Sequence, residues 1–167
     1  MNKDQDIIIA SGQIMGEHNT IPRGSGRLVN WQWWQSISRG LYPVNYGYES
    51  WLVAKCVSMG KKFAVYPQIK STVQRPTATN YKDEKYFHRG QAYHALGYNK
   101  RFVMCRALVM ILKQHKIIAT KKMLSGFFTP DDTIELYDND VRKYYRDLQD
   151  KQTSIRNMPE LIRRFRM

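Results

Sequence analysis

The first 80 residues contain short apolar runs that end at glycine or proline, a pattern typical of alternating strands and helices. The run IIIASGQIM (7–15) and the run KKFAVYP (61–67) predict two strands, the second of which is ended by its proline. Between them, the tryptophan-rich residues 27–38 and the apolar residues 49–59 are each closely followed by a glycine, which predicts two helices. The order strand, helix, helix, strand predicts an α/β layer.

The pattern changes near the polar stretch RPTATN (75–80), whose proline is typical of a connection. Beyond it apolar residues recur at helical spacing, and only residues 133–137 are compatible with a further strand. The predicted helices cover 83–96, 100–114, 119–128, 140–152 and 159–166. We therefore predict an α/β portion over 1–80 and a basic amphipathic helical tail over 81–167. So few strands cannot complete a doubly wound sheet, and we expect part of the fold to be missing from this chain.

Composition narrows the class of protein and of partner. The 167 residues are 43% hydrophobic and 13% aromatic, which is too rich in core-forming side chains for a disordered segment. The 27 Lys and Arg against 14 Asp and Glu give a net charge of +13, which favours nucleic acid, phospholipid headgroups or diphosphates as partners. Cys56 and Cys105 match neither a metal-ligand pair nor a disulfide framework, which favours the cytoplasm. The apolar stretch 102–112 is too short to cross a bilayer.

Glu49 is the only carboxylate between Glu17 and Asp83, so any acid–base role in that segment falls to it. It lies in YGYESW (46–51), where a glycine turn leads into a predicted helix near the mouth of the sheet. Ligands of α/β folds bind at such positions. A glutamate in the first turn of a helix also interacts favourably with the helix dipole, and the sequence alone leaves both interpretations open.

The loop PRGSGR (22–27) is a second candidate site, because small residues between two arginines open a predicted helix. Backbone N–H groups and guanidinium groups in such a loop can approach an anionic or polyhydroxyl ligand. Glycines also occur in ordinary strand-to-helix turns, and the loop lacks the lysine of a phosphate-binding P-loop.

Together, PRGSGRLVNWQWW and YGYESWLVAKCVSMGKKFAVYP resemble the second half of family 2 glycosyltransferases of the GT-A fold. In that family a Gly-x-Gly loop and the basic or polar residue after it line the sugar site. A Glu-Asp pair then opens a helix, and a glycine, a basic residue, a strand and a proline follow. The stretches RPTATNYKDEKYFHRGQAYHALGYNKRFVMCRALVMILK and DNDVRKYYRDLQ resemble the amphipathic tail of archaeal members, so the resemblance covers about Gly12 to Gln149.

The resemblance implies a partial GT-A-type sheet with flanking helices, followed by an α-helical C-terminal tail. It also implies that a sugar passes from a nucleotide or lipid-phosphate donor to an acceptor hydroxyl with inversion at the anomeric carbon. Glu49 and Ser50 stand where the family has its Glu-Asp pair, so either Glu49 takes over the role of the base or the chain keeps only binding. The substrate-binding residues implied are Arg23, Gly24, Ser25, Gly26, Arg27 and Trp51.

The family's nucleotide-binding strands and its metal-binding Asp-x-Asp precede the region that this chain resembles. We therefore expect no cofactor within the chain, Mg²⁺ or Mn²⁺ only in a complete enzyme, and no activity without the nucleotide-binding half. Asp138-Asn139-Asp140 matches Asp-x-Asp literally, but its position before VRKYYRDLQ favours a helix cap. The four histidines lack the spacing of metal ligands.

Residues 100–122 combine an apolar belt with lysines and arginines, which predicts peripheral contact with an anionic membrane, for instance at its inner, cytoplasmic face. A core helix with a solvated basic face is the simpler alternative. The chain could also form a homodimer or join a separate N-terminal half. A non-catalytic basic module that binds nucleic acid or an anionic membrane surface is the rival function, although no known nucleic-acid-binding motif supports the nucleic-acid version.

Overall fold

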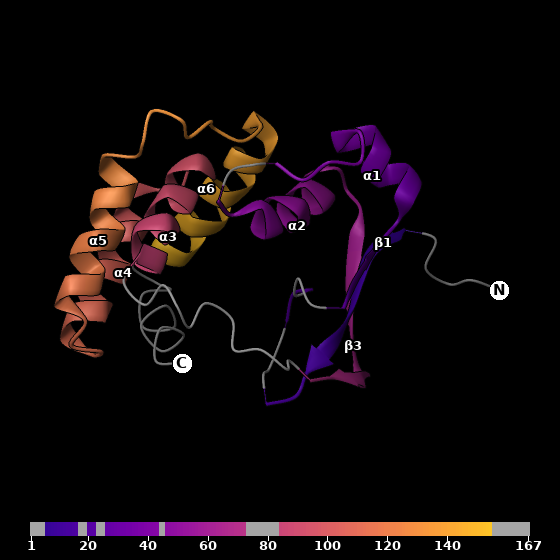
Figure 1. The fold of residues 1–167 in the computed structure, drawn as a ribbon, viewed down its shortest axis with the longest axis horizontal. Helices are drawn as coiled ribbons and strands as arrows, with labels where there is room; N and C mark the ends of the chain where they lie inside the picture. The colour runs from indigo at the N-terminus through magenta and orange to yellow at the C-terminus, as the bar shows by residue number, and fades with distance from the viewer. Residues whose placement is uncertain (1–5, 17–19, 23–25, 44–45, 73–83, 155–167) are drawn as a thin grey trace. The chain divides into compact units, whose positions relative to one another are not determined.

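The computed structural model describes residues 6–16, 20–22, 26–43, 46–72 and 84–154. The chain divides into two compact units (Figure 1). The first comprises Met1–Val44 and Tyr48–Thr77, and the second comprises Asn45–Gly47 and Ala78–Met167. The sequence predicted a single division after residue 80. It did not predict that Asn45–Gly47 belongs to the second unit.

The first unit is a small mixed sheet with two helices, so the α/β class predicted from the sequence is confirmed at this level. Its elements are β1 (Ile7–Ile14), β2 (Arg27–Val29), α1 (Trp31–Ser38), α2 (Tyr48–Ser58) and β3 (Lys62–Ser71). The strand order is β2-β1-β3, with β2 antiparallel and β3 parallel to the central strand β1. Helix α2 contacts β1 and β3 through a nearly all-round apolar surface, which is typical of a buried helix.

The predicted helix over 27–38 is wrong in its first turn. Arg27–Val29 pairs with Ser11, Ala10 and Ile9 of β1, and helix α1 begins only at Trp31. Asn30 separates the two elements because its backbone is extended and its side-chain Oδ1 accepts a hydrogen bond of 3.0 Å from the Trp33 N–H. The cap at Asn30 therefore starts the helix at Trp31, four residues after the strand begins to pair, and Arg27 becomes a sheet residue.

The prediction that Pro67 ends the second strand is also wrong, because β3 continues to Ser71. The register jumps here: Gly12 pairs with Tyr66 and Gln13 with Lys70, so three residues of β3 bulge outward. An edge strand with a bulge can accommodate a proline that lacks the ladder N–H. A side chain at Gly12 would collide with the Ile69 carbonyl oxygen, so the bulge also explains this glycine.

The second unit contains four of the predicted helices, each displaced by no more than a few residues. They are α3 (Glu84–Ala95), α4 (Lys100–Leu112), α5 (Ile117–Phe128) and α6 (Asn139–Thr153). Residues 133–137 form no strand, and the predicted helix 159–166 lies outside the described residues. Asp138 occupies the N-cap position of α6, as predicted, although its side chain makes no capping hydrogen bond. Among the described helices, none has the length and apolarity needed to cross a membrane.

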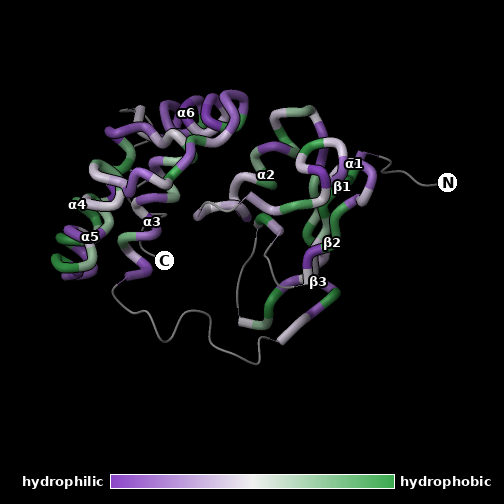
Figure 2. Tube along the Cα trace, turned by 45° about the horizontal axis from the view of Figure 1, so that its top comes forward, coloured by the Kyte–Doolittle hydropathy of each residue, from purple (hydrophilic) through white to green (hydrophobic). Residues whose placement is uncertain are grey.

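The core of the second unit lies between α3, α4 and α5. Its buried residues are Tyr93, Val103, Ala107, Met110, Met123 and Phe127. In Figure 2 the tube of α6 is mainly hydrophilic, whereas α4 and α5 carry many hydrophobic positions. Helix α6 nevertheless buries Val141 and packs the Tyr145 ring 4.9 Å from that of Tyr98. Hydrogen bonds also attach it: Asn99 donates its backbone N–H to Gln149 Oε1 at 2.6 Å, and Arg146 donates to the Gly97 carbonyl at 3.2 Å.

A chain of polar contacts attaches Tyr46 to this unit. The Tyr46 ring stacks on His88 with centroids 4.1 Å apart, and its hydroxyl lies 3.3 Å from His88 Nε2. His88 Nδ1 donates to Gln91 Oε1 at 2.9 Å, and Gln91 Nε2 donates to Asp131 at 2.6 Å. The Gln91 amide is buried and therefore needs both partners. These contacts explain why Asn45–Gly47 belongs to the helical unit although it interrupts the sequence of the first unit.

Glycines allow α3 and α5 to approach closely. A side chain at Gly90 would collide with the Met123 carbonyl, and one at Gly126 would collide with the Phe87 carbonyl. Because the obstacles are backbone atoms of a neighbouring helix, the site cannot relax by turning a side chain. The two glycines therefore set the distance between these helices.

Gly126→Ala tests this close approach. Alanine would normally stabilise a helix interior by about 1 kcal/mol, but overpacking against backbone should outweigh that gain and lower the free energy of unfolding by about 1–3 kcal/mol. Chemical denaturation measures the change. The control is Lys121→Ala on the exposed side of α5, which should change stability by less than about 0.5 kcal/mol. A Gly126→Ala protein as stable as this control would contradict the packing.

Tyr98 should make the stability of the protein depend on pH in alkaline solution. Burial, and then the neighbouring Tyr145 and Tyr93, raise the pKa of Tyr98 well above its usual value near 10. The folded state therefore keeps the phenol neutral while the unfolded state ionises, so its stabilising effect is complete below pH 10 and is lost as the pH rises through the folded pKa. Tyr98→Phe keeps the ring stacking and should flatten the fall of unfolding free energy above pH 10. Equal slopes in both proteins would contradict this account.

Candidate functional site

The site is built around a contact between the start of β2 and the first turn of α2. Arg27 Nη2 lies 3.6 Å from Glu49 Oε1, and Arg27 Nη1 donates a 3.5 Å hydrogen bond to the Glu49 carbonyl. The position of Arg27 is fixed because β2 pairs with β1 and the Asn30 N–H donates to the Ile8 carbonyl at 2.8 Å. One guanidinium thus contacts both the side chain and the backbone of a residue in the first turn of α2.

The two charged partners differ in their exposure to solvent. The Arg27 side chain is 2% exposed, whereas the Glu49 side chain is 49% exposed. Arg27 Nε is buried and has no hydrogen-bond partner among the described residues, which makes the contacts of the other two nitrogens with Glu49 more important for the stability of the charge. The arrangement therefore combines an immobile cation with a carboxylate that a ligand can reach.

Two tyrosines lie near this pair, and one of them contacts a tryptophan. The Tyr42 ring meets Trp34 edge to face with centroids 4.2 Å apart, and it lies 5.0 Å from the Tyr48 ring. Both tyrosines are exposed, while Trp34 is buried beneath them. Burial raises the pKa of Tyr42; Tyr48 and Glu49 add to the increase, and Arg27 opposes it. We call Arg27, Trp34, Tyr42, Tyr48 and Glu49 the Glu49 cluster.

The residue types of the Glu49 cluster suit contact with a hydroxyl compound and the acceptance of a proton from it. Exposed phenol rings offer flat apolar faces with a polar edge, which suits a ring that carries both C–H and O–H groups. A half-exposed carboxylate beside them can accept a hydrogen bond from a bound hydroxyl and then its proton. All members come from the first unit.

The other predicted site residues fall into three groups. Arg23, Gly24 and Ser25 lie outside the described residues, whereas Gly26 is described and has a φ of +69°, which favours glycine directly before Arg27. Ser50 follows Glu49 in α2 and is partly exposed. Trp51 is only 4% exposed and belongs to the core of the first unit.

The sequence interpretation missed the aromatic members of the cluster. Tyr42 and Tyr48 flank a loop that contains a third tyrosine, Tyr46, within seven residues, and this spacing could have suggested an aromatic binding surface. Tyr46 lies in the second unit, however, so spacing alone does not identify which rings adjoin Glu49. Among the described residues, no group of three or more His, Cys, Asp or Glu could hold a metal ion.

Comparisons with protein-family models, with curated proteins and with solved structures each found no match to this chain. The candidate function therefore depends on the geometry of the Glu49 cluster and on the sequence resemblance.

Proposed function

We propose that this chain is the acceptor-side part of an inverting glycosyltransferase and that the Glu49 cluster is its acceptor site. The reaction moves a sugar from a nucleotide or lipid-phosphate donor to an acceptor hydroxyl. The observation that carries the proposal is the accessible Glu49 carboxylate beside a buried guanidinium and exposed aromatic rings. The order of the Gly-x-Gly loop, the helix that Glu49 opens and the following strand supports it through the family resemblance.

Each member of the cluster has a role in this proposal. Glu49 accepts the proton of the acceptor hydroxyl while the oxygen attacks the anomeric carbon and the bond to the leaving phosphate breaks. Arg27 is a positioning residue, because its buried guanidinium restricts the Glu49 side chain to one side of the α2 N-terminus. Tyr42 and Tyr48 contact the acceptor ring, and the buried Trp51 supports α2 from the core.

The same resemblance places the donor on a different part of the enzyme. The resemblance implies that the sugar site on this chain is lined by Arg23, Gly24, Ser25, Gly26 and Arg27. A nucleotide-binding half with an Asp-x-Asp and its Mg²⁺ or Mn²⁺ would supply the rest. The opposite possibility, a non-catalytic basic module, would make Glu49 dispensable, so a substitution there separates the two functions.

Glu49→Gln should lower kcat for sugar transfer by roughly 10²–10⁴-fold, because the amide cannot accept the proton. Glutamine keeps the size of the side chain and an oxygen that can accept from Arg27, and the Arg27 hydrogen bond to the backbone carbonyl of residue 49 remains, so the fold should persist. The assay follows release of the donor's nucleotide when the full chain is mixed with the product of a neighbouring reading frame that carries Asp-x-Asp.

Glu84→Gln is the matched control, because Glu84 is an exposed carboxylate in the first turn of α3, on the other unit. It should leave turnover unchanged. Near-normal turnover by a folded Glu49→Gln protein would rule out Glu49 as the base.

Tyr42→Ala and Tyr48→Ala should weaken acceptor binding more than they affect chemistry. Loss of one aromatic contact corresponds to about 0.5–1.5 kcal/mol, which is about a two- to tenfold rise in the acceptor KM with a smaller change in kcat. With the chain alone, saturation-transfer NMR against a panel of methyl glycosides should show weaker binding for the same variants. Tyr66→Ala removes an exposed ring from β3 of the same unit and should have neither effect. Equal losses in all three variants would contradict the placement of the acceptor.

A further inference from the structure

The outward side of α4 and the start of α5 expose aliphatic side chains that no described element covers. Met104, Leu108 and Leu112 are spaced four residues apart and so form one stripe along α4. Leu112 is 70% exposed, and after a short turn Ile118 in the first turn of α5 is 68% exposed. We call Met104, Leu108, Leu112, Ile117 and Ile118 the α4–α5 tip.

These residues are not part of the core of the helical unit. Helix α4 contributes Val103, Ala107 and Met110 to that core, and α5 contributes Met123 and Phe127. Helix α4 is therefore apolar on two sides, one that packs against α3 and α5 and one that faces solvent. The alternative of a core helix with a wholly solvated basic face does not account for the second side.

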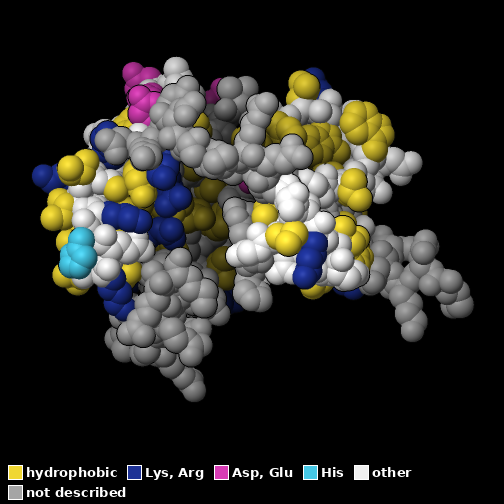
Figure 3. Space-filling model, turned by 60° about the horizontal axis from the view of Figure 1, so that its bottom comes forward, with side chains coloured by type: hydrophobic (Ala, Val, Ile, Leu, Met, Phe, Trp, Pro, Cys, Tyr) yellow, Lys and Arg dark blue, Asp and Glu magenta, His cyan; other side chains and the backbone are white. Residues whose placement is uncertain are grey.

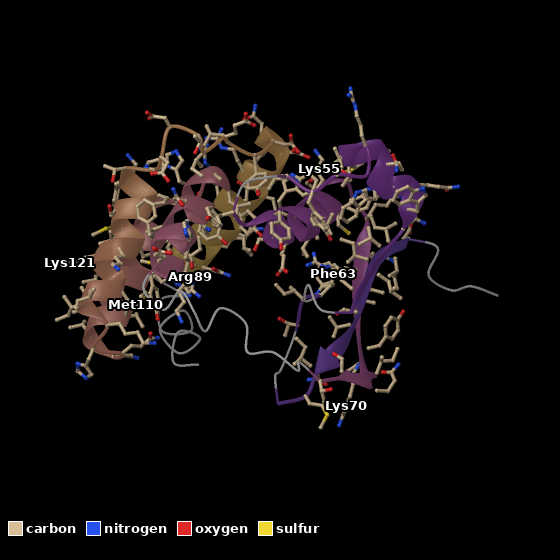
Figure 4. All side chains as sticks on the ribbon, in the orientation of Figure 1. Lys55, Phe63, Lys70, Arg89, Met110 and Lys121 are labelled. Atoms are coloured by element: carbon tan, nitrogen blue, oxygen red, sulfur yellow. The ribbon has the colours of Figure 1, made fainter. Side chains whose placement is uncertain are left out.

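The charges around the tip all have one sign. Residues 85–130 contain no Asp or Glu. They contain nine basic residues: Lys85, Arg89, Lys100, Arg101, Arg106, Lys113, Lys116, Lys121 and Lys122. Figure 3 shows lysines and arginines among hydrophobic side chains on one face of the helical unit, and Lys121 projects from α5 in Figure 4.

The combination of aliphatic and basic side chains indicates what kind of partner the tip would bind. Lys113 and Lys116 are exposed in the turn between Leu112 and Ile117, so positive charge and apolar surface alternate over a few residues. Lysines with long apolar stems beside aliphatic side chains suit the boundary between lipid headgroups and acyl chains. A surface for single-stranded nucleic acid would use aromatic rings for stacking, and the tip has none.

We propose that the α4–α5 tip docks this protein on an anionic lipid surface, with Leu112, Ile117 and Ile118 entering the headgroup region and Lys113, Lys116 and Lys121 contacting lipid phosphates. The surface lies on the helical unit and does not depend on the function of the Glu49 cluster.

Vesicle co-sedimentation of the full chain tests the proposal. The vesicles are phosphatidylcholine alone or phosphatidylcholine with about a third phosphatidylglycerol, and binding should require the anionic lipid and fall as salt increases. The variant Lys113→Gln/Lys116→Gln/Lys121→Gln should lose about fivefold in affinity for each lysine, and so on the order of a hundredfold. Ile117→Ser/Ile118→Ser should lose at least about tenfold at unchanged charge.

Two control variants remove the same kinds of side chain from positions outside the tip. Lys62→Gln/Lys70→Gln/Lys143→Gln removes three exposed lysines outside the tip, among them Lys70 near the end of β3 (Figure 4), and has the same net charge as the first variant. Ile69→Ser/Leu136→Ser removes two exposed aliphatic side chains outside the tip. Both controls should bind vesicles within about threefold of the unaltered protein.

Three outcomes would overturn the proposal. The first is equal vesicle affinity of the tip variants and their controls. The second is binding to a single-stranded oligonucleotide that needs the lysines but not the isoleucines, without vesicle binding, which would assign the surface to nucleic acid. The third is a homodimer that dissociates in Ile117→Ser/Ile118→Ser while the protein fails to bind vesicles. Circular dichroism and thermal unfolding verify that each variant is folded.

Discussion

The first unit depends on one buried positive charge. The Arg27 guanidinium is almost completely removed from water, and a buried charge needs polar partners within the fold. Glu49 is the only carboxylate between Glu17 and Asp83, so within that segment no other side chain can balance it. The contact joins the strand β2 to the first turn of α2 and leaves half of the Glu49 side chain in solvent. Glu49 thus balances the buried charge of Arg27 and also presents a carboxylate that solvent can reach.

The sequence predicted the elements better than their boundaries. Apolar residues at helical spacing located α3 to α6 within a few residues, because glycine or an Asn or Asp cap marks several of the ends. It failed at Arg27–Val29 and at Pro67, where pairing with β1 overrides local preference. Strand pairing depends on residues far away in the sequence, and a bulge such as that at Gly12 leaves no periodic signal.

The sequence predicted the charged residues of the candidate site but not the aromatic residues beside them. Glu49 and Arg27 stood out because carboxylates are scarce in this segment and because an arginine follows the glycine loop. Their proximity and the participation of Tyr42 and Trp34 depend on the path of residues 39–48, which sequence spacing does not determine. Trp51 was predicted to bind substrate and follows Glu49 and Ser50 in the sequence, yet its side chain is buried in the core.

The central claim is the coupling between Arg27 and Glu49, and a double-mutant cycle in unfolding free energy measures it most directly. The cycle compares the unaltered protein with Arg27→Met, Glu49→Gln and the double variant. The account predicts that the two effects are non-additive by on the order of 0.5 kcal/mol, and that this coupling decreases in high salt. Strict additivity at low salt would show that the guanidinium and the carboxylate do not interact, and it would contradict the account.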